Sequence, residues 1–311
     1  MSSEPKAEMA AGQPFSRLET EGVNPATVHI DRMSPLEIVQ AMNAEDAKVA
    51  RAVQHELPSI ARAIEAIAER MRRGGRLLYF GAGTSGRLGA LDAAECPPTF
   101  NLPQERVMGR IAGGEFALWQ SVEDLEDSVE AGRADAERLD ITEADTVVGI
   151  AASGRTPYVL GAIAHAKAHG ALTIGLACNS QTPLEHEVEI MIAPVVGPEV
   201  ISGSTRLKAG TAQKMVLNML STGTMILLGK TFGNLMVDVQ ATNLKLRRRA
   251  LTIVQQATGL DTAAAEALLA ASNDEVKTAI LVGCAHIEPQ TAREQLAKHG
   301  DVLRAALDAL Q

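Results

Sequence analysis

Five short apolar segments alternate along this chain with longer segments of helical periodicity, and this alternation constrains the fold more than any other feature. Parallel strands need long crossover connections, usually helices, so segments of these lengths indicate a parallel sheet covered on both faces. The sequence therefore predicts a doubly wound, five-stranded parallel α/β fold flanked by helices. The predicted strands are 77–80, 107–111, 146–151, 172–177 and 190–194, and the predicted helices between and after them are 86–95, 116–138, 157–169 and 207–229.

Helical patterns also flank this region. Residues 35–72 are predicted to be helical, with Ser34 as the first N-cap and Pro35 in the first turn. After Gly259 the sequence becomes rich in alanine, which indicates a small all-helical module. Its predicted helices are 261–270, 273–284, 290–298 and 301–310. The predicted divisions are a disordered tail over 1–20, a helical segment over 21–75, an α/β domain over 76–250 and the helical module over 251–311.

Composition narrows the class of protein. The net charge of −9 over 311 residues argues against a nucleic-acid partner. The three cysteines are odd in number and widely spaced, so neither a disulfide framework nor a zinc site is expected, and we expect no metal. No segment resembles a signal peptide or is long and apolar enough to span a bilayer, so a cytoplasmic protein without membrane contact is expected.

A glycine-rich loop between the first strand and the next helix has the chemistry of a phosphate cradle. Gly83 and Gly86 let the backbone approach a ligand closely, and Thr84 and Ser85 add hydroxyl donors. A helix starting near Arg87 would point unpaired N–H groups and its positive dipole end at an anion. These residues predict a binding site for a small phosphorylated molecule.

Two other interpretations of this loop remain open. The spacing Gly81-x-Gly83-x-x-Gly86 also fits the dinucleotide fingerprint, which requires an acidic residue at the end of the second strand. That strand is followed by Ala112-Gly113-Gly114, with Glu115 only afterwards, so a phosphosugar fits better. A tight turn that binds no ligand is the second alternative.

Two later loops repeat the combination of glycine, hydroxyl and basic residues. One follows the third strand and the other precedes the helix at 207–229. Loops at the carboxyl ends of parallel strands converge on one crevice, the usual ligand site of open α/β sheets. The candidate phosphosugar ligands in these loops are Ser153, Gly154, Arg155, Thr156, Ser204 and Lys208.

On these motifs the chain resembles proteins with a sugar isomerase (SIS) domain and, more narrowly, the N-acetylmuramic acid 6-phosphate etherase family. The resemblance implies cleavage of a D-lactyl ether to give N-acetylglucosamine 6-phosphate and D-lactate. It also implies no cofactor, a homodimer with its site near the subunit interface, and a ubiquitin-associated-like (UBA-like) C-terminal module. The stretches that carry it are 81–98, 150–158, 199–205, 202–214 and 233–238.

The implied reaction defines which residues to seek. An ether oxygen is a poor leaving group, but ring opening creates an aldehyde at C1 that makes the C2 proton acidic. The C3 lactyl oxygen can then leave by syn β-elimination, and water adds to the unsaturated aldehyde. A base and an acid, each contributing about 10²–10⁴-fold, are needed, and two carboxylates with different pKa values suffice.

Glu95 is the candidate acid. Because Pro97 disfavours helical geometry at Cys96, the helix is predicted to end near Glu95, where negative potential favours the protonated carboxyl. The Glu-Cys-Pro-Pro context matches the family, although a lone surface glutamate is the simpler alternative. Along a helix, Glu95 lies ~15 Å from Ser85, which exceeds the phosphate-to-C3 reach of one sugar. Either the helix is shorter than predicted, or Glu95 serves the pocket of the other subunit.

Glu126 is the candidate C2 base by resemblance, and Glu123 is its reserve. Glu126 borders the apolar stripe of the predicted helix at 116–138, although a solvated acidic helix face is the alternative. The family usually has Glu-Gly-Ala-Glu-Asp here, whereas this chain has Glu-Asp-Leu-Glu-Asp at 123–127. Glu199 is a further candidate sugar contact. The predicted stripe consists of Leu118, Val122, Leu125 and Val129.

Two other functions share the same loops. A phosphosugar-binding regulator resembling glucokinase regulatory protein would need no acid–base pair, and an aldose–ketose phosphosugar isomerase would share the C2 proton chemistry. The two candidate glutamates favour the etherase, and lactate release distinguishes all three.

Overall fold

The computed structural model describes residues 18–310 except 121, 123 and 239–243. A five-stranded sheet lies at its centre, with every neighbouring pair of strands parallel and in the order β2-β1-β3-β4-β5. The predicted fold class is therefore confirmed. The strands are β1 (Leu77–Gly81), β2 (Val107–Ile111), β3 (Thr146–Ile150), β4 (Leu172–Leu176) and β5 (Ile190–Ile192).

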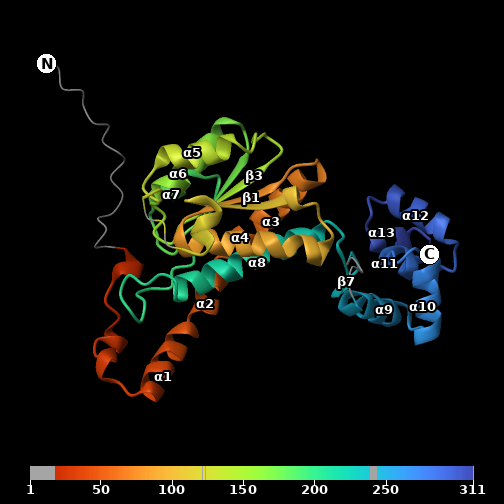
Figure 1. Cartoon of the computed structure of the whole chain (residues 1–311), viewed down its shortest axis with the longest axis horizontal. Coiled ribbons are helices and arrows are strands. Elements are labelled where there is room, and N and C mark those ends of the chain that lie inside the picture. The colour runs from red at the N-terminus through yellow and green to blue at the C-terminus, as the bar shows by residue number, and fades with distance from the viewer. Residues whose placement is uncertain (1–17, 121, 123, 239–243, 311) are drawn as a thin grey trace. The chain divides into compact units, whose positions relative to one another are not determined.

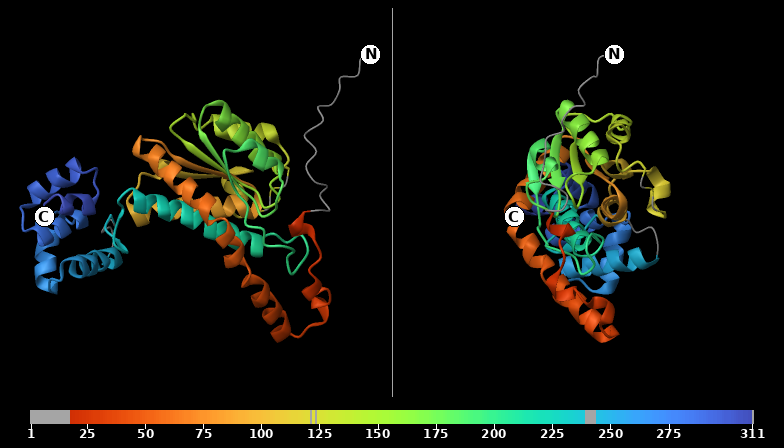
Figure 2. Two further views of the ribbon diagram at one scale, coloured as in Figure 1. Left: turned by 180° about the vertical axis from the view of Figure 1, so that it is seen from behind. Right: turned by 90° about the vertical axis from the view of Figure 1, so that its left-hand side faces the viewer.

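Helices cover both faces of the sheet (Figures 1 and 2). On one face lie α3 (Leu57–Arg72), α4 (Gly83–Phe100) and α8 (Lys208–Leu227), and on the other lie α5 (Val129–Glu137), α6 (Pro157–Ala168) and α7 (Pro183–Glu187). The core under α5 and α6 is built from alternate strand residues such as Leu78 and Phe80, packed against Tyr158 and Ile163 of α6. All five residues of β3 are buried, as expected for a central parallel strand.

The N-terminal helices form an arm, in which α1 (Pro35–Asp46) and then α2 (Val49–His55) run from the outer end back toward the sheet (Figure 1). The predicted cap at Ser34 is present as a capping box with Glu37. Glu45 is the one buried residue in α1, and the apolar Leu36 and Val39 are exposed. Most of the predicted tail at 1–20 lies outside the described residues.

The predicted bounds of the helix at 86–95 were wrong at both ends, because α4 spans Gly83–Phe100. It begins directly after β1, and it continues through Pro97 and Pro98. A proline inside a helix costs about 3 kcal/mol. Here the last turn buries Cys96 and Phe100, and this burial favours the helix beyond the prolines.

The predicted helix at 116–138 was also wrong, because two shorter elements occupy the region. A 3₁₀ turn spans Gly114–Leu118, and α5 begins only at Val129, where the Ser128 hydroxyl caps the helix. The expected apolar stripe is not buried, since Leu125 and Val129 are both exposed. Residues 124–127 form a turn instead, because the local cap competes with the helical periodicity.

A second compact unit contains Glu95–Gln104 together with the chain from Ser221 onward. Asp238 accepts ion pairs from Lys230 and Lys277 at 2.8 Å within it, and its helices enclose their own apolar core. The C-terminal helical region is thus confirmed, whereas the domain boundary at 250/251 stays a prediction. Its elements are β6 (Thr231–Phe232), β7 (Leu235–Met236), α9 (Leu244–Thr258), α10 (Thr262–Ala271), α11 (Val276–Ala285), α12 (Pro289–Lys298) and α13 (Leu303–Asp308). None of the helices in the described ranges has the length and apolarity to cross a membrane.

Candidate active site

The turn from β1 into α4 brings the backbone of the glycine loop to the carboxyl edge of the sheet. Gly81 and Gly86 lie against each other, and a Cβ on Gly81 would lie 2.7 Å from the Gly86 nitrogen. Gly83 has a φ of +53°, and a Cβ there would meet nothing within 4 Å. Gly81 and Gly86 thus serve strand–helix packing, while Gly83 opens the N-terminus of α4 toward a ligand.

A cavity of about 330 Å³ lies at this edge, where β1 and β2 end. It combines the N-terminus of α4 with two carboxylates and one guanidinium, so it can receive a molecule that carries both an anion and an acidic proton. Its lining residues are Gly83, Arg87, Ala112, Ala117, Val122, Glu126 and Asp127.

Glu126 reaches the cavity from the turn before α5 rather than from a helix. Its carboxylate accepts a hydrogen bond from the Thr156 hydroxyl at 3.3 Å, and its backbone carbonyl accepts one from the Tyr158 N–H at 3.1 Å. Thr156 stands at the N-cap of α6, but its side chain makes no capping bond there. The first turn of α6 therefore fixes Glu126, and this contact joins the second predicted loop to the candidate base.

Two charged residues of the cavity lining were not identified as site residues from the sequence. Asp127 lies beside Glu126 in the lining and supplies a second carboxylate. Arg87 donates to the backbone carbonyls of Leu118 and Gln120 at 3.2 and 3.0 Å, and so holds the segment that leads to the carboxylates. Asp127 could have been identified from its position next to Glu126 in the sequence. Nothing local in the sequence indicated the role of Arg87.

The remaining loop residues lie close by without lining the cavity. The Ser85 hydroxyl is buried and donates to Gln213 of α8 at 3.0 Å. The Ser153 hydroxyl accepts from the Arg155 N–H at 3.2 Å, which shapes the second loop. Gly154 packs against Thr182, where an added Cβ would lie within 2.4 Å of that side chain.

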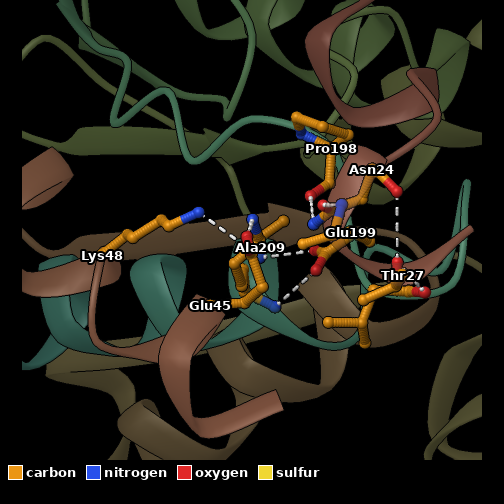
Figure 3. A network of polar contacts seen from close by, with 10 residues as sticks. Asn24, Thr27, Glu45, Lys48, Pro198, Glu199 and Ala209 are labelled. Atoms are coloured by element: carbon orange, nitrogen blue, oxygen red, sulfur yellow. Dashed lines mark hydrogen bonds and ion pairs between the residues drawn. The ribbon is translucent and has the colours of Figure 1, made fainter. Parts of the chain in front are cut away.

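The third predicted loop is tied into a buried polar network rather than into the cavity (Figure 3). The Lys208 ammonium, only 2 % exposed, pairs with the Glu45 carboxylate of α1 at 2.6 Å. The Glu199 carboxylate accepts from the N–H groups of Lys208 and Ala209 at 3.0 and 2.9 Å and so satisfies the start of α8. Among the described residues, Lys208 has a structural partner, and its predicted role as a phosphate ligand stays a prediction, as does that of Ser204.

Opposing effects act on the two carboxylates of this network. Burial raises the pKa of Glu199, although hydrogen bonds from Ala209 and Lys208 and the Lys208 charge oppose it. Burial also acts to raise the pKa of Glu45, but Lys208 and Lys48 outweigh it and lower that pKa from 4.5 to about 2. Glu45 is therefore ionised at neutral pH and holds the base of the arm to α8.

Glu95 does not line the cavity, and its side chain is exposed on α4. Because α4 continues to Phe100, Glu95 is not at a helix end, and the argument that helix-end potential protonates it was wrong. Glu123, the reserve base, lies outside the described residues. Within the described part of the chain, no cluster of three or more His, Cys, Asp or Glu side chains could hold a metal ion.

Comparisons with known proteins identify the families and relatives that this chain resembles. The SIS domain family model matches residues 116–223, and the model of the glucokinase regulatory protein N-terminal SIS domain matches residues 59–167. The N-acetylmuramic acid 6-phosphate etherase of Serratia proteamaculans is 55% identical over 290 residues, which cover 93% of this chain and 98% of the relative. The Streptomyces coelicolor protein of the same name is 56% identical over 292 residues, 94% of each chain. A solved phosphoheptose isomerase from Francisella tularensis has 15% identity and a TM-score of 0.45, over 62% of this chain and 100% of that one.

Proposed function

Because the chain belongs to the N-acetylmuramic acid 6-phosphate etherase family, we propose that it is a carbon–oxygen lyase acting on N-acetylmuramic acid 6-phosphate. The products are N-acetylglucosamine 6-phosphate and D-lactate, with one water consumed. The observation that carries the proposal is the shared cavity of the α4 N-terminus, Glu126 and Asp127. That combination brings an anion site and a base into one cavity.

The phosphate binds at the first turn of α4. The N–H groups there have no partner inside the helix, and the dipole favours a dianion. Thr84 and Ser85 lie in the same first turn, and the open side of Gly83 admits the phosphate without a side chain in the way. With the phosphate anchored there, the sugar carbons lie in the cavity that the Glu126 and Asp127 carboxylates also line.

Glu126 removes the C2 proton of the open-chain aldehyde. The Thr156 hydrogen bond fixes its carboxylate in the cavity. The electron pair left at C2 forms the C2–C3 double bond as the lactyl oxygen departs with a proton from an acid. Water then adds at C3 and the proton returns to C2. The aldehyde itself stabilises the carbanionic charge, so this route needs no cofactor. Asp127, in the same lining, is the second carboxylate available to the elimination or to the added water.

Glu95 acts as the acid from the partner subunit of a homodimer. Ten helical residues separate it from Ser85 on one continuous α4, or ~15 Å, and its side chain is exposed. The exposed apolar residues Leu36 and Val39 of α1, a helix with a single buried residue, support an interface at the arm. A twelve-residue helix is marginal in water without such packing.

Lactate release from N-acetylmuramic acid 6-phosphate tests the reaction. The wild-type chain is expected to release one lactate per sugar, and Glu126→Gln to lower kcat by about 10²–10⁴-fold. Asp124→Asn is the matched control and should leave kcat unchanged, since it removes an exposed carboxylate of the same turn that does not line the cavity. Exchange of the C2 proton in D₂O should survive Glu95→Gln and disappear in Glu126→Gln. A wild-type chain that isomerises the sugar or only binds it would refute the proposal.

Subunit mixing tests the location of the acid. A Glu95→Gln subunit and a subunit carrying both Ser85→Ala and Ser153→Ala are each expected to be inactive alone. In the mixed dimer, one pocket combines intact hydroxyls with an intact Glu95, so part of the activity should return. No recovery in a verified heterodimer would place Glu95 in the pocket of its own subunit.

A phosphosugar-binding regulator is the second candidate, because the glucokinase regulatory protein SIS model matches residues 59–167. Such a protein would bind N-acetylglucosamine 6-phosphate through the α4 N-terminus without changing it. Binding with neither lactate release nor C2 proton exchange would favour this function over the lyase.

A further inference from the structure

A buried amide lies behind the hydroxyl of the glycine loop. Gln213 of α8 is only 1 % exposed, and its Oε1 accepts the Ser85 hydroxyl proton at 3.0 Å. Its Nε2 is also buried and finds no hydrogen-bond partner among the residues that the structure describes. Buried polar groups nearly always have partners, so an orphaned amide nitrogen beside a ligand loop calls for a physical reason.

The start of α8 is packed closely enough against the loop to position this amide. A Cβ on Gly210 would lie 3.5 Å from the Thr84 methyl, so α8 passes the loop at a glycine. The Gly210 N–H donates to the Thr205 carbonyl at 2.9 Å, which fixes the turn that begins the helix. Gln213 follows three residues later and meets Ser85, the third residue of α4.

The hydrogen-bond chemistry of a phosphate conflicts with the direction of the Ser85–Gln213 hydrogen bond. A serine hydroxyl has one proton to donate, and phosphate oxygens at neutral pH chiefly accept. While Ser85 donates to Gln213, it has no proton to give to a phosphate. For Ser85 to bind phosphate, its partner must change from an acceptor to a donor. Glutamine can make this change by rotating its terminal amide, because one side accepts and the other donates.

We propose that Gln213 is a positioning residue for the phosphate site and that its amide rotates when the phosphosugar binds. Nε2 then donates to the Ser85 oxygen, and Ser85 donates its proton to a phosphate oxygen. The rotation gives Nε2 a partner and releases the hydroxyl proton to the ligand, while Oε1 gives up the bond that it accepts from Ser85. The inference rests on the proposed function only in taking the α4 N-terminus as the phosphate site.

A double-mutant cycle on phosphosugar affinity tests the inference. Calorimetric titration of the full chain with N-acetylglucosamine 6-phosphate is expected to show about tenfold weaker binding for both Gln213→Met and Ser85→Ala, the loss of one good hydrogen bond. Because Gln213 acts through Ser85, the double variant should bind no more weakly than Ser85→Ala alone. Additive losses, or unchanged affinity in Gln213→Met, would overturn the inference.

Further variants separate this role from a simple packing role. Gln213→Glu keeps the size, and its ionised carboxylate can only accept, so once the pH is high enough to ionise it this variant should retain the Ser85 proton and bind less tightly than Gln213→Met. The exposed Gln54→Met is the matched control and should bind as wild type does. If Gln213→Met does not fold, Gln213→Glu replaces it in the double-mutant cycle with Ser85→Ala. Additive losses of phosphosugar affinity in that cycle would overturn the inference.

The outcomes also separate this inference from the proposed reaction. Wild-type lactate release with normal affinity in Gln213→Met would refute the inference and leave the reaction standing. Phosphosugar binding with non-additive losses but no lactate release would uphold the inference and refute the reaction. A wild-type chain that binds no phosphosugar would refute both.

Discussion

The ion pair between Glu45 and Lys208 allows a quantitative test of how the N-terminal arm is held. The two side chains are 5 % and 2 % exposed and their charged atoms lie 2.6 Å apart. Glu45→Gln removes one charge and leaves the Lys208 ammonium buried without compensation. Removing one member of a buried pair typically costs about 3–5 kcal/mol of the free energy of unfolding.

The pKa of Glu45 gives an independent magnitude. A folded-state pKa lowered from 4.5 to about 2 corresponds to about 3 kcal/mol at neutral pH, since each pKa unit is worth about 1.4 kcal/mol. For a carboxylate with a lowered pKa, this stability is fully present above pH 4.5 and is lost as the pH falls toward 2. Glu199 acts in the opposite direction, because its raised pKa favours the folded state on acidification.

Urea unfolding followed by circular dichroism measures the loss, and hydrogen exchange over residues 35–56 localises it to the arm. Lys48→Ala is the matched control. Lys48 pairs with the same carboxylate at 2.6 Å but is 62 % exposed, so it should cost no more than about 1 kcal/mol. The difference in free energy of unfolding between wild type and Glu45→Gln should narrow only below pH 4.5. This pH dependence distinguishes the contribution of Glu45 from that of Glu199. Equal small effects of Glu45→Gln and Lys48→Ala, or a gap independent of pH, would refute the reasoning.

Three further predictions concern the glycine loop and the sheet edge. Gly81→Ala should abolish folding of the α/β unit by circular dichroism, because its Cβ would lie 2.7 Å from the Gly86 backbone nitrogen. Gly83→Ala should fold at a cost of about 1 kcal/mol for its positive φ and bind N-acetylglucosamine 6-phosphate more weakly in titration. Asp145→Asn should cost about 3 kcal/mol in urea unfolding, because Asp145 is a buried partner of Arg76 at 2.7 Å. Burial raises the pKa of Asp145, but its bonds to Arg76 outweigh burial and bring the pKa below 3.8. The loss of unfolding free energy in Asp145→Asn should therefore shrink as the pH falls below 3.8.

The sheet could be predicted because its signals are local. The central strands β1, β3 and β4 are short apolar runs in which every residue is buried. The edge strands β2 and β5 are partly buried. The helix over 116–138 failed for an equally local reason. Ser128 was available as an N-cap that starts a new helix at Val129, and its hydroxyl accepts the Ala131 N–H at 3.0 Å. The apolar spacing before Ser128 has helical periodicity but does not form a helix. The N-cap at Ser128 determines where the helix begins.

The site shows the limit of sequence reasoning more clearly. Glu126 and Thr156 were each predicted as site residues, but the hydrogen bond that joins them spans 30 residues and depends on the packing of α6. Lys208 looked like a phosphate ligand by residue type, yet its partner is Glu45, 163 residues away on the arm. A basic residue in a loop does not reveal whether a buried carboxylate already neutralises it. That distinction comes only from the fold.

Glu95 is the residue for which the structure changes the argument most. Its acidity was first attributed to a helix end created by Pro97, a local effect that the continuous α4 removes. The burial of Cys96 and Phe100 holds the last turn in place, which leaves Glu95 exposed in the body of the helix. Glu95 also does not line the cavity that holds Glu126. If Glu95 donates the proton to the departing lactate, it does so in the pocket of another subunit, so subunit mixing tests the acid role and the dimer interface in one experiment.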